Sequence, residues 1–89
     1  MSSIMKLFKA LSLDTRMKMI LKLYIGEMSV NQLAWNTGME QSHVSHHLKQ
    51  LKEANIVTCR PQGKKRMYSL NKETIEPMIA LAEKHVDAE

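Results

Sequence analysis

Two groups of polar side chains in this 89-residue sequence have the types and spacing that suit a nucleic acid. The first lies within residues 41–46, where Gln41, two serines and two histidines offer hydrogen-bond donors and acceptors. The second lies within residues 56–70, which hold four basic residues and no acidic one. Amide, hydroxyl and imidazole groups can address base edges, and cations can neutralise phosphates. A solvated helix face and a charged, exposed turn are the alternative interpretations.

The histidines also raise the question of a metal site. His43 and His47 stand four residues apart, so they would share one face of a helix, and zinc binds such pairs when a third ligand is near. No cysteine or acidic residue stands at a matching offset, and base recognition accounts for the same side chains. We therefore predict no metal site and no cofactor.

Other chemistries find little support in the sequence. No nucleophile–base pair, phosphate-binding loop or carboxylate pair has a supporting context, so we do not expect an enzyme. The single cysteine, Cys59, excludes a disulfide framework within the chain and is interpreted as a small, buried or half-buried apolar side chain. The sequence shows neither an apolar run long enough to span a membrane nor a signal peptide, so we expect no membrane contact and a cytoplasmic location.

The charge is unevenly distributed. The whole chain carries a formal charge of +4, but residues 71–89 hold two basic and five acidic side chains, which leaves +7 on the first seventy residues. A local excess of positive charge of this kind indicates a polyanionic partner.

The spacing of apolar residues predicts four helices before residue 56. A first amphipathic helix covers about residues 3–12, and a second follows Asp14, which we predict to be its N-cap. Ser29 and Gln32 have the spacing of a capping box at the start of a third helix, which Gly38 would end. A fourth helix buries Val44 and the leucines that follow it, and it ends near Asn55.

After residue 56 the pattern changes to that of a hairpin and a last helix. Residues 57–60 and 66–70 are rich in strand-forming residues, and a basic tip at 61–65 separates them. Residues 74–87 return to helical spacing. The resulting order (α-α-α-α-β-β-α) predicts a mainly α fold with a small β-hairpin, the winged helix-turn-helix. We expect one domain, residues 1–89, with the helix-turn-helix at about 29–54, the wing at about 56–70 and terminal helices at about 3–12 and 74–87.

Four segments in this order resemble the ArsR/SmtB family of transcriptional regulators. Residues 8–16 look like the opening signature of that family, residues 26–34 like its first helix-turn-helix segment, residues 41–51 like its recognition helix and residues 63–70 like its wing. The resemblance implies that Ser42, Ser45 and His46 read DNA and that His47 packs and orients the helix. The sequence departs from the family at Glu40, a poorer helix cap that places negative charge near DNA.

Together, the residue types and the resemblance predict a double-stranded DNA interface on the fourth helix and the wing. For Tyr68, packing on the core is an equally good interpretation. The expected DNA-binding residues are Gln41, Ser42, His43, Ser45, His46, Lys49, Arg60, Lys64, Lys65, Arg66 and Tyr68.

The terminal helices carry more apolar surface than a chain this short is expected to cover, which predicts a homodimer through the first and last helices. The alternative is that these residues only complete the core of the monomer. The expected interface residues are Ile4, Leu7, Phe8, Leu11, Ile75, Met78, Ile79, Ala82 and Val86.

The resemblance also bears on regulation. In the thiolate sensors of the family, cysteines stand where this chain has Ser29 and Asn31, and the metal-binding pattern of the last helix is met here only by His85. We therefore predict a homodimeric repressor on a two-fold symmetric operator, and the sequence leaves open whether a small-molecule or metal inducer exists. The alternatives are a winged-helix protein-interaction module, or a metal-responsive repressor whose non-standard site includes Glu76, Asp87 and Glu89.

Overall fold

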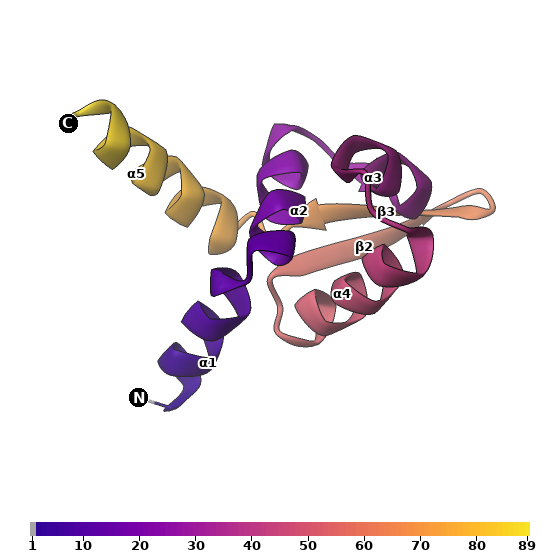
Figure 1. The fold of residues 1–89 in the computed structure, drawn as a ribbon, viewed down its shortest axis with the longest axis horizontal. Helices are drawn as coiled ribbons and strands as arrows, with labels where there is room; N and C mark the ends of the chain where they lie inside the picture. The colour runs from indigo at the N-terminus through magenta and orange to yellow at the C-terminus, as the bar shows by residue number, and fades with distance from the viewer. Residues whose placement is uncertain (1) are drawn as a thin grey trace.

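The computed structural model describes residues 2–89 and has the predicted winged helix-turn-helix architecture (Figure 1). Every predicted element lies within a few residues of its expected range; of the expected domain, Met1 is outside the described residues. In chain order the elements are α1 (Ser2–Ser12), α2 (Asp14–Ile25), β1 (Met28–Ser29), α3 (Val30–Thr37), α4 (Gln41–Glu53), β2 (Val57–Gln62), β3 (Lys65–Leu70) and α5 (Ile75–Asp87).

The core lies where α2, α3, α4 and the sheet meet. Its fully buried side chains come from α2, α3 and α4, from Ile56 and from the inner ends of the wing strands, and on α4 they are spaced three or four residues apart, as the periodicity predicts. Burying one such side chain stabilises the fold by about 1.5–3 kcal/mol, so this cluster holds α4 rigidly in place. The largest of these residues are Met19, Ile20, Leu33, Leu48, Leu51, Ile56 and Leu70.

The sheet has three strands, so the prediction of a lone hairpin was incomplete. Its order is β1-β3-β2, and both pairings are antiparallel, with Met28 opposite Tyr68 in the additional pair. A two-residue strand has no periodicity that a sequence could reveal, because its pairing depends on a partner some forty residues away. The additional strand joins the base of the wing directly to the start of α3.

The wing strands extend further than expected. Gln62 pairs with Lys65, which reduces the predicted five-residue tip to Gly63 and Lys64. Gly63 has a φ of 63°, a conformation that glycine adopts without steric cost and that suits the first position of a two-residue hairpin loop. The strand pairing therefore includes Pro61, opposite Arg66, and holds the tip residues in a fixed frame.

Capping explains how the helices around the recognition segment begin. The Ser29 hydroxyl accepts a hydrogen bond from the Gln32 amide at 3.2 Å, and the Gln32 side chain accepts one from the Ser29 amide at 2.9 Å, which confirms the capping box. The prediction of Asp14 as an N-cap was wrong: Leu13 occupies that position, and Asp14 is the first residue of α2. Its carboxylate there still interacts favourably with the helix dipole.

The end of α4 turns the chain sharply into the wing. Asn55 has a φ of 58°, and its amide donates to the Lys52 carbonyl at 3.0 Å while the Ile56 amide donates to the Leu51 carbonyl at 2.9 Å. This is the Schellman pattern, in which a left-handed residue satisfies the last carbonyls of a helix. The predicted stop near Asn55 is thus confirmed, and buried Ile56 leads directly into β2.

Candidate nucleic-acid interface

The predicted reading residues of α4 share its solvent-exposed surface. Val44, Leu48 and Leu51 are at most 1% exposed and anchor the helix to the core. The remaining predicted side chains of α4 all face solvent, namely Gln41, Ser42, His43, Ser45, His46 and Lys49. The chain thus presents a polar helix surface on a rigid support, as insertion into a DNA groove requires.

Gln41, the first residue of α4, has a partner that sequence reasoning missed. Its Nε2 donates a hydrogen bond to Oδ1 of Asn31, on the first turn of α3, at 2.6 Å. The bond joins the starts of the two helices of the helix-turn-helix and, among residues 2–89, leaves Oε1 of Gln41 without a hydrogen-bond donor. No pattern in the sequence indicates it, because the two residues meet only when α3 and α4 cross.

Arg16, near the start of α2, is a second unexpected part of this surface. Its guanidinium donates to Nδ1 of His47 at 3.4 Å and to Oε1 of Gln50. Nε2 of Gln50 lies 3.3 Å from Nε2 of His46. Burial of the His47 ring, reinforced by the charge of Arg16, lowers the pKa of His47 below its ordinary value of 6.5. His47 is half-buried and in contact with Arg16, while the orienting role implied by the family resemblance stays a prediction.

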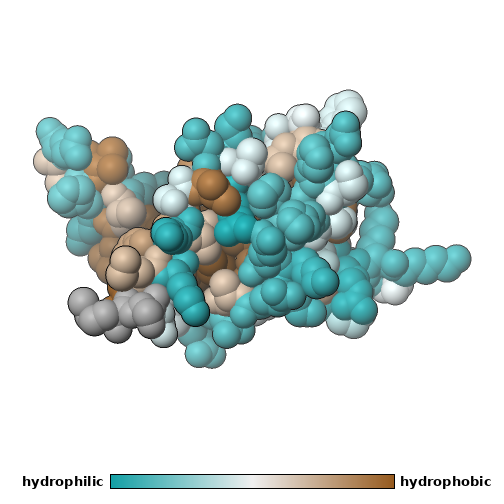
Figure 2. Space-filling view, turned by 60° about the horizontal axis from the view of Figure 1, so that its bottom comes forward, coloured by the Kyte–Doolittle hydropathy of each residue, from teal (hydrophilic) through white to brown (hydrophobic). Residues whose placement is uncertain are grey.

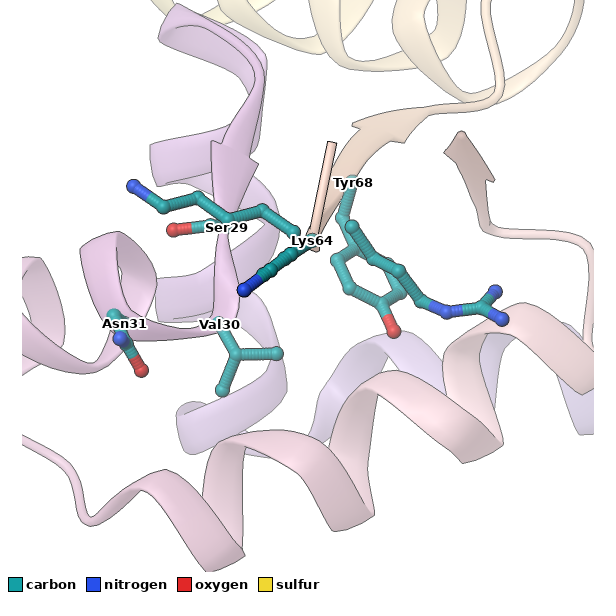
Figure 3. Close-up of a pocket in the computed structure, with 7 residues that line it drawn as sticks. Ser29, Val30, Asn31, Lys64 and Tyr68 are labelled. Atoms are coloured by element: carbon teal, nitrogen blue, oxygen red, sulfur yellow. The ribbon is translucent and has the colours of Figure 1, made fainter. Parts of the chain in front are cut away.

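The tip of the wing and the start of α3 enclose a basic groove of about 290 Å³ (Figure 3). Lys64 and Tyr68 lie on the wing side of this groove, and Ser29, Val30 and Asn31 lie on the α3 side. Lys65 and Arg66 complete the lining, so three of the four predicted wing cations gather here.

Tyr68 of the wing partly fits both interpretations offered for it, a DNA contact and packing on the core. Tyr68 is half-buried, packs against the core and also lines the basic groove. Burial, reinforced by the neighbouring Cys59, raises the pKa of Tyr68 above its ordinary value of 10.0. Cys59 is itself half-buried, as expected, and its sulfur accepts a 3.8 Å hydrogen bond from Arg66.

Arg60 stands apart from the other wing cations. It donates to both carboxylate oxygens of Glu27, at 2.8 and 2.6 Å, and to the Gln62 side chain at 3.0 Å. The Ser69 hydroxyl donates to the same carboxylate, and the hydrogen bond from Arg60 is the main cause that lowers the pKa of Glu27. Arg60 therefore pairs with the segment before β1 and does not line the basic groove.

The predicted dimer residues divide between the core and the surface. Leu11, Ile75 and Ile79 are buried within the monomer, which supports the alternative interpretation for those three positions. Leu7 and Met78 are half-buried. The exposed members are Ile4, Phe8, Ala82 and Val86, and they are joined by Met5 and Leu81 on the same two helices.

Apolar residues gather at the end of the molecule formed by α1 and α5, whereas the wing end is mainly hydrophilic (Figure 2). In Figure 1, these two helices splay away from the rest of the fold, and both chain termini lie there. An apolar hollow of about 330 Å³ runs between α2 and α5, lined by Met17, Leu21, Ile79, Ala82 and Val86 together with two acidic residues. The polar and apolar surfaces thus lie at opposite ends.

The residues at the family's thiolate positions do not fit a metal. Ser29 is only 5% exposed and caps α3, and Asn31 binds Gln41. Across residues 2–89, no three His, Cys, Asp or Glu side chains lie close enough together to hold a metal ion. Over the same residues, no helix has the length and apolar character to cross a membrane.

Comparison with known proteins identifies the family. The model of the bacterial regulatory proteins of the arsR family matches residues 14–58, from α2 to the start of β2. The chain belongs to this family. It is a transcriptional regulator with a winged helix-turn-helix DNA-binding domain, so the residues on α4 and the wing belong to a DNA-binding fold.

Individual relatives extend the match beyond the family model. A cadmium resistance transcriptional regulatory protein, a CadC homolog of Staphylococcus aureus, is 38% identical over 81 residues, which cover 90% of this chain and 67% of the relative. The transcriptional repressor SdpR of Bacillus subtilis is 33% identical over 72 residues, covering 81% of this chain and 80% of the repressor.

Among solved structures, a homodimeric winged helix-turn-helix DNA-binding domain from Mycobacterium bovis is similar with a TM-score of 0.87 and 28% identity. The similarity covers 97% of this chain and 80% of that domain, so it includes α1 and α5 as well as the wing.

Proposed function

We propose that this arsR-family regulator represses transcription by binding, as a homodimer, a two-fold symmetric operator in double-stranded DNA. The relatives support this proposal, since one is named as a repressor and the Mycobacterium bovis domain is a homodimer. The protein would act by occupying DNA in the cytoplasm and not by catalysis. The observation that carries the proposal is the exposed polar surface of α4 beside the basic groove of the wing.

In this proposal α4 enters the major groove with its N-terminal half against the bases. Gln41 would present Oε1, and Ser42, Ser45 and His46 would supply short polar contacts to base edges. His43 and Lys49 lie on the same exposed surface and complete the set. Because Leu48 and its neighbours anchor the helix, these side chains approach DNA from a fixed frame.

The wing would contact the phosphates and the adjacent minor groove. Lys64, Lys65 and Arg66 stand together at its tip, close to the first turn of α3, where the helix dipole also favours an anion. Tyr68 could add a phosphate contact from the same groove. We expect Arg60 to contribute indirectly, by holding the wing against Glu27, since that carboxylate already engages its guanidinium.

The homodimer would form through the exposed apolar residues of α1 and α5. A two-fold axis there would place the two copies of α4 and the two wings on one elongated surface, with the acidic α5 away from the DNA. The dimer interface would centre on residues that are exposed in the monomer, namely Ile4, Phe8, Leu81 and Val86. The members of the expected set that are buried in the monomer would hold α1 and α5 in place.

Selection of bound duplexes from a random pool, followed by binding measurements, tests the proposal. We expect the selected sites to be palindromic and to bind at least a thousandfold more tightly than a scrambled duplex at physiological salt, about the lower end for specific DNA-binding proteins. A transcription assay with the selected site upstream of a reporter should show reduced output. Equal binding of selected and scrambled duplexes would contradict the proposal.

A further inference from the structure

A row of hydrogen bonds connects α2 to the DNA-facing surface of α4. It begins at Arg16, which donates to Gln50 Oε1 and also to His47 Nδ1 at 3.4 Å. It continues from Gln50 Nε2 to His46 Nε2, 3.3 Å away and one helical turn back. His46 is exposed on the surface assigned to base recognition, whereas Arg16 and Gln50 are half-buried behind it.

The donor and acceptor roles along this row follow from the chemistry of the groups. A guanidinium can only donate, so the Gln50 atom that faces Arg16 must be the amide oxygen. The other end of that amide is then an NH₂ group, which can only donate, and Nε2 of His46 must therefore accept. A neutral imidazole that accepts at Nε2 carries its proton on Nδ1.

The same guanidinium imposes the opposite arrangement on the next residue. Nδ1 of His47 accepts from Arg16, so the proton of the neutral His47 ring lies on Nε2. Burial and the neighbouring charge of Arg16 lower the pKa of His47, which favours the uncharged ring. Two adjacent histidines thus hold opposite tautomers because of one arginine.

We propose that Arg16 is a positioning residue that fixes, through Gln50, the tautomer in which His46 presents an Nδ1–H donor to DNA. Within residues 2–89, Nδ1 of His46 has no hydrogen-bond partner, so this donor is available to a base. The consequence for DNA rests on the proposed function, whereas the assignment of the tautomers does not.

A fixed donor restricts the bases that His46 can accept. In the major groove guanine offers only acceptors and thymine offers the O4 acceptor, whereas cytosine offers only an amino donor. The Nδ1–H tautomer therefore favours guanine or thymine over cytosine at the contacted position. The other tautomer would present a bare nitrogen and would reverse this preference.

Nuclear magnetic resonance of the free protein tests the tautomers without DNA. Long-range ¹H–¹⁵N correlation on the ¹⁵N-labelled full chain at about pH 8, above the ordinary histidine pKa, distinguishes protonation at Nδ1 from protonation at Nε2. We expect His46 to be protonated at Nδ1 and His47 at Nε2. Protonation of His46 at Nε2 in the unmodified protein would overturn the inference.

Two variants distinguish this hydrogen-bond relay, from Arg16 through Gln50 to His46, from an effect of side-chain packing alone. Gln50→Glu keeps the acceptor for Arg16 but removes the donor to His46, so we expect the His46 proton to move to Nε2 while His47 stays unchanged. Arg16→Met should abolish both preferences. His43 and His85 lie outside the relay and serve as internal controls. An unchanged His46 in Gln50→Glu overturns the proposal, and that result does not depend on Arg16→Met being folded.

Base preference provides the functional readout. On selected duplexes that differ at single positions, Gln50→Glu should reduce discrimination against cytosine by about tenfold at the position His46 contacts, comparable to one good base contact. Unchanged discrimination at every position would contradict the role of the relay in recognition. If the unmodified protein fails to bind DNA specifically, the proposed function fails while the tautomer measurement still decides the inference.

Discussion

The two ends of this molecule are built on different physical principles. Within the described residues, every hydrogen bond between two side chains joins groups of α2, α3, α4, the sheet or the segment before β1, and none includes a residue of α1 or α5. The terminal helices instead expose large apolar side chains such as Ile4, Phe8 and Val86. The DNA-facing end, formed by α2, α3, α4 and the wing, holds polar side chains in fixed orientations. The terminal end, formed by α1 and α5, provides apolar surface that can be buried.

This difference fits the two tasks assigned to the ends. Discriminating between bases requires donors and acceptors at fixed positions, and hydrogen bonds such as Gln41–Asn31 hold polar side chains in one arrangement. Joining two copies requires mainly apolar burial, which is non-directional and tolerates a loosely specified geometry. Substitutions at the DNA-facing end should therefore impair folding or base recognition, whereas matched substitutions at the terminal end should impair dimerisation.

The largest expected effect on stability is at the anchored leucine of α4. Leu48 is 1% exposed, so Leu48→Ala should lower the free energy of unfolding by about 2–5 kcal/mol. The matched change Leu81→Ala alters an apolar residue of α5 that is 67% exposed in the monomer and should weaken dimerisation more than monomer folding. Denaturant unfolding at several protein concentrations separates the two effects. If both variants lost the same free energy of unfolding at every protein concentration, the proposed difference between the two ends would be contradicted.

Introducing charge at the terminal end should dissociate the dimer. Phe8 is 56% exposed, and burial of each copy would contribute about 1.5 kcal/mol or more, so Phe8→Glu should raise the dimer dissociation constant by about 100-fold or more. Sedimentation velocity would measure this change. Trp35→Glu is the matched control, since Trp35 is 88% exposed on α3 and away from the terminal helices. An unaltered dimer in Phe8→Glu would place the interface elsewhere.

Within the DNA-facing end, wing and helix variants should differ in kind. Lys64→Ala should weaken binding to all duplexes alike and flatten the salt dependence by about 0.9 per lost phosphate contact, or nearly two for a dimer. Ser45→Ala should relax base discrimination and leave the salt slope unchanged. Lys84→Ala, on α5, is the control for lost charge. Fluorescence anisotropy titrations at several salt concentrations would measure both properties. If the Lys64 and Ser45 variants changed the salt slope and the base discrimination in the same way, the prediction would be contradicted.

The smallest expected effect concerns the ion pair at the base of the wing. Arg60 lowers the folded pKa of Glu27 below its ordinary value of 4.5, so the pair stabilises the fold above about pH 4.5 and loses this contribution as the pH falls through the folded pKa. Glu27→Gln should remove this part of the pH dependence while changing stability little at neutral pH, because the pair is exposed. Thermal unfolding from pH 3 to 7 would measure it; parallel profiles for the two proteins would contradict it.

How far the sequence predicts this protein depends on the range of each interaction. The helices, the capping box at Ser29, the stop at Asn55 and the exposed surface of α4 were all predictable, because periodicity and capping act within a few residues. The four segments that resemble the ArsR/SmtB family also indicated the family, which the comparisons confirm. Asp14 was misassigned because the helix begins one residue earlier than a side-chain cap requires: Leu13 takes the N-cap position without a cap hydrogen bond, and Asp14 lies in the first turn, which a carboxylate also suits.

What escaped prediction depends on residues that are distant in the chain. Strand β1 exists because it pairs with β3, Arg60 faces Glu27 across the sheet, and Arg16 reaches Gln50 from another helix. Each contact joins positions more than thirty residues apart, and no local pattern encodes such a meeting. Residue types and short-range spacing were therefore sufficient for the elements and the kind of partner. The packing of α2 and the sheet against α4 was needed to show how the reading side chains are held.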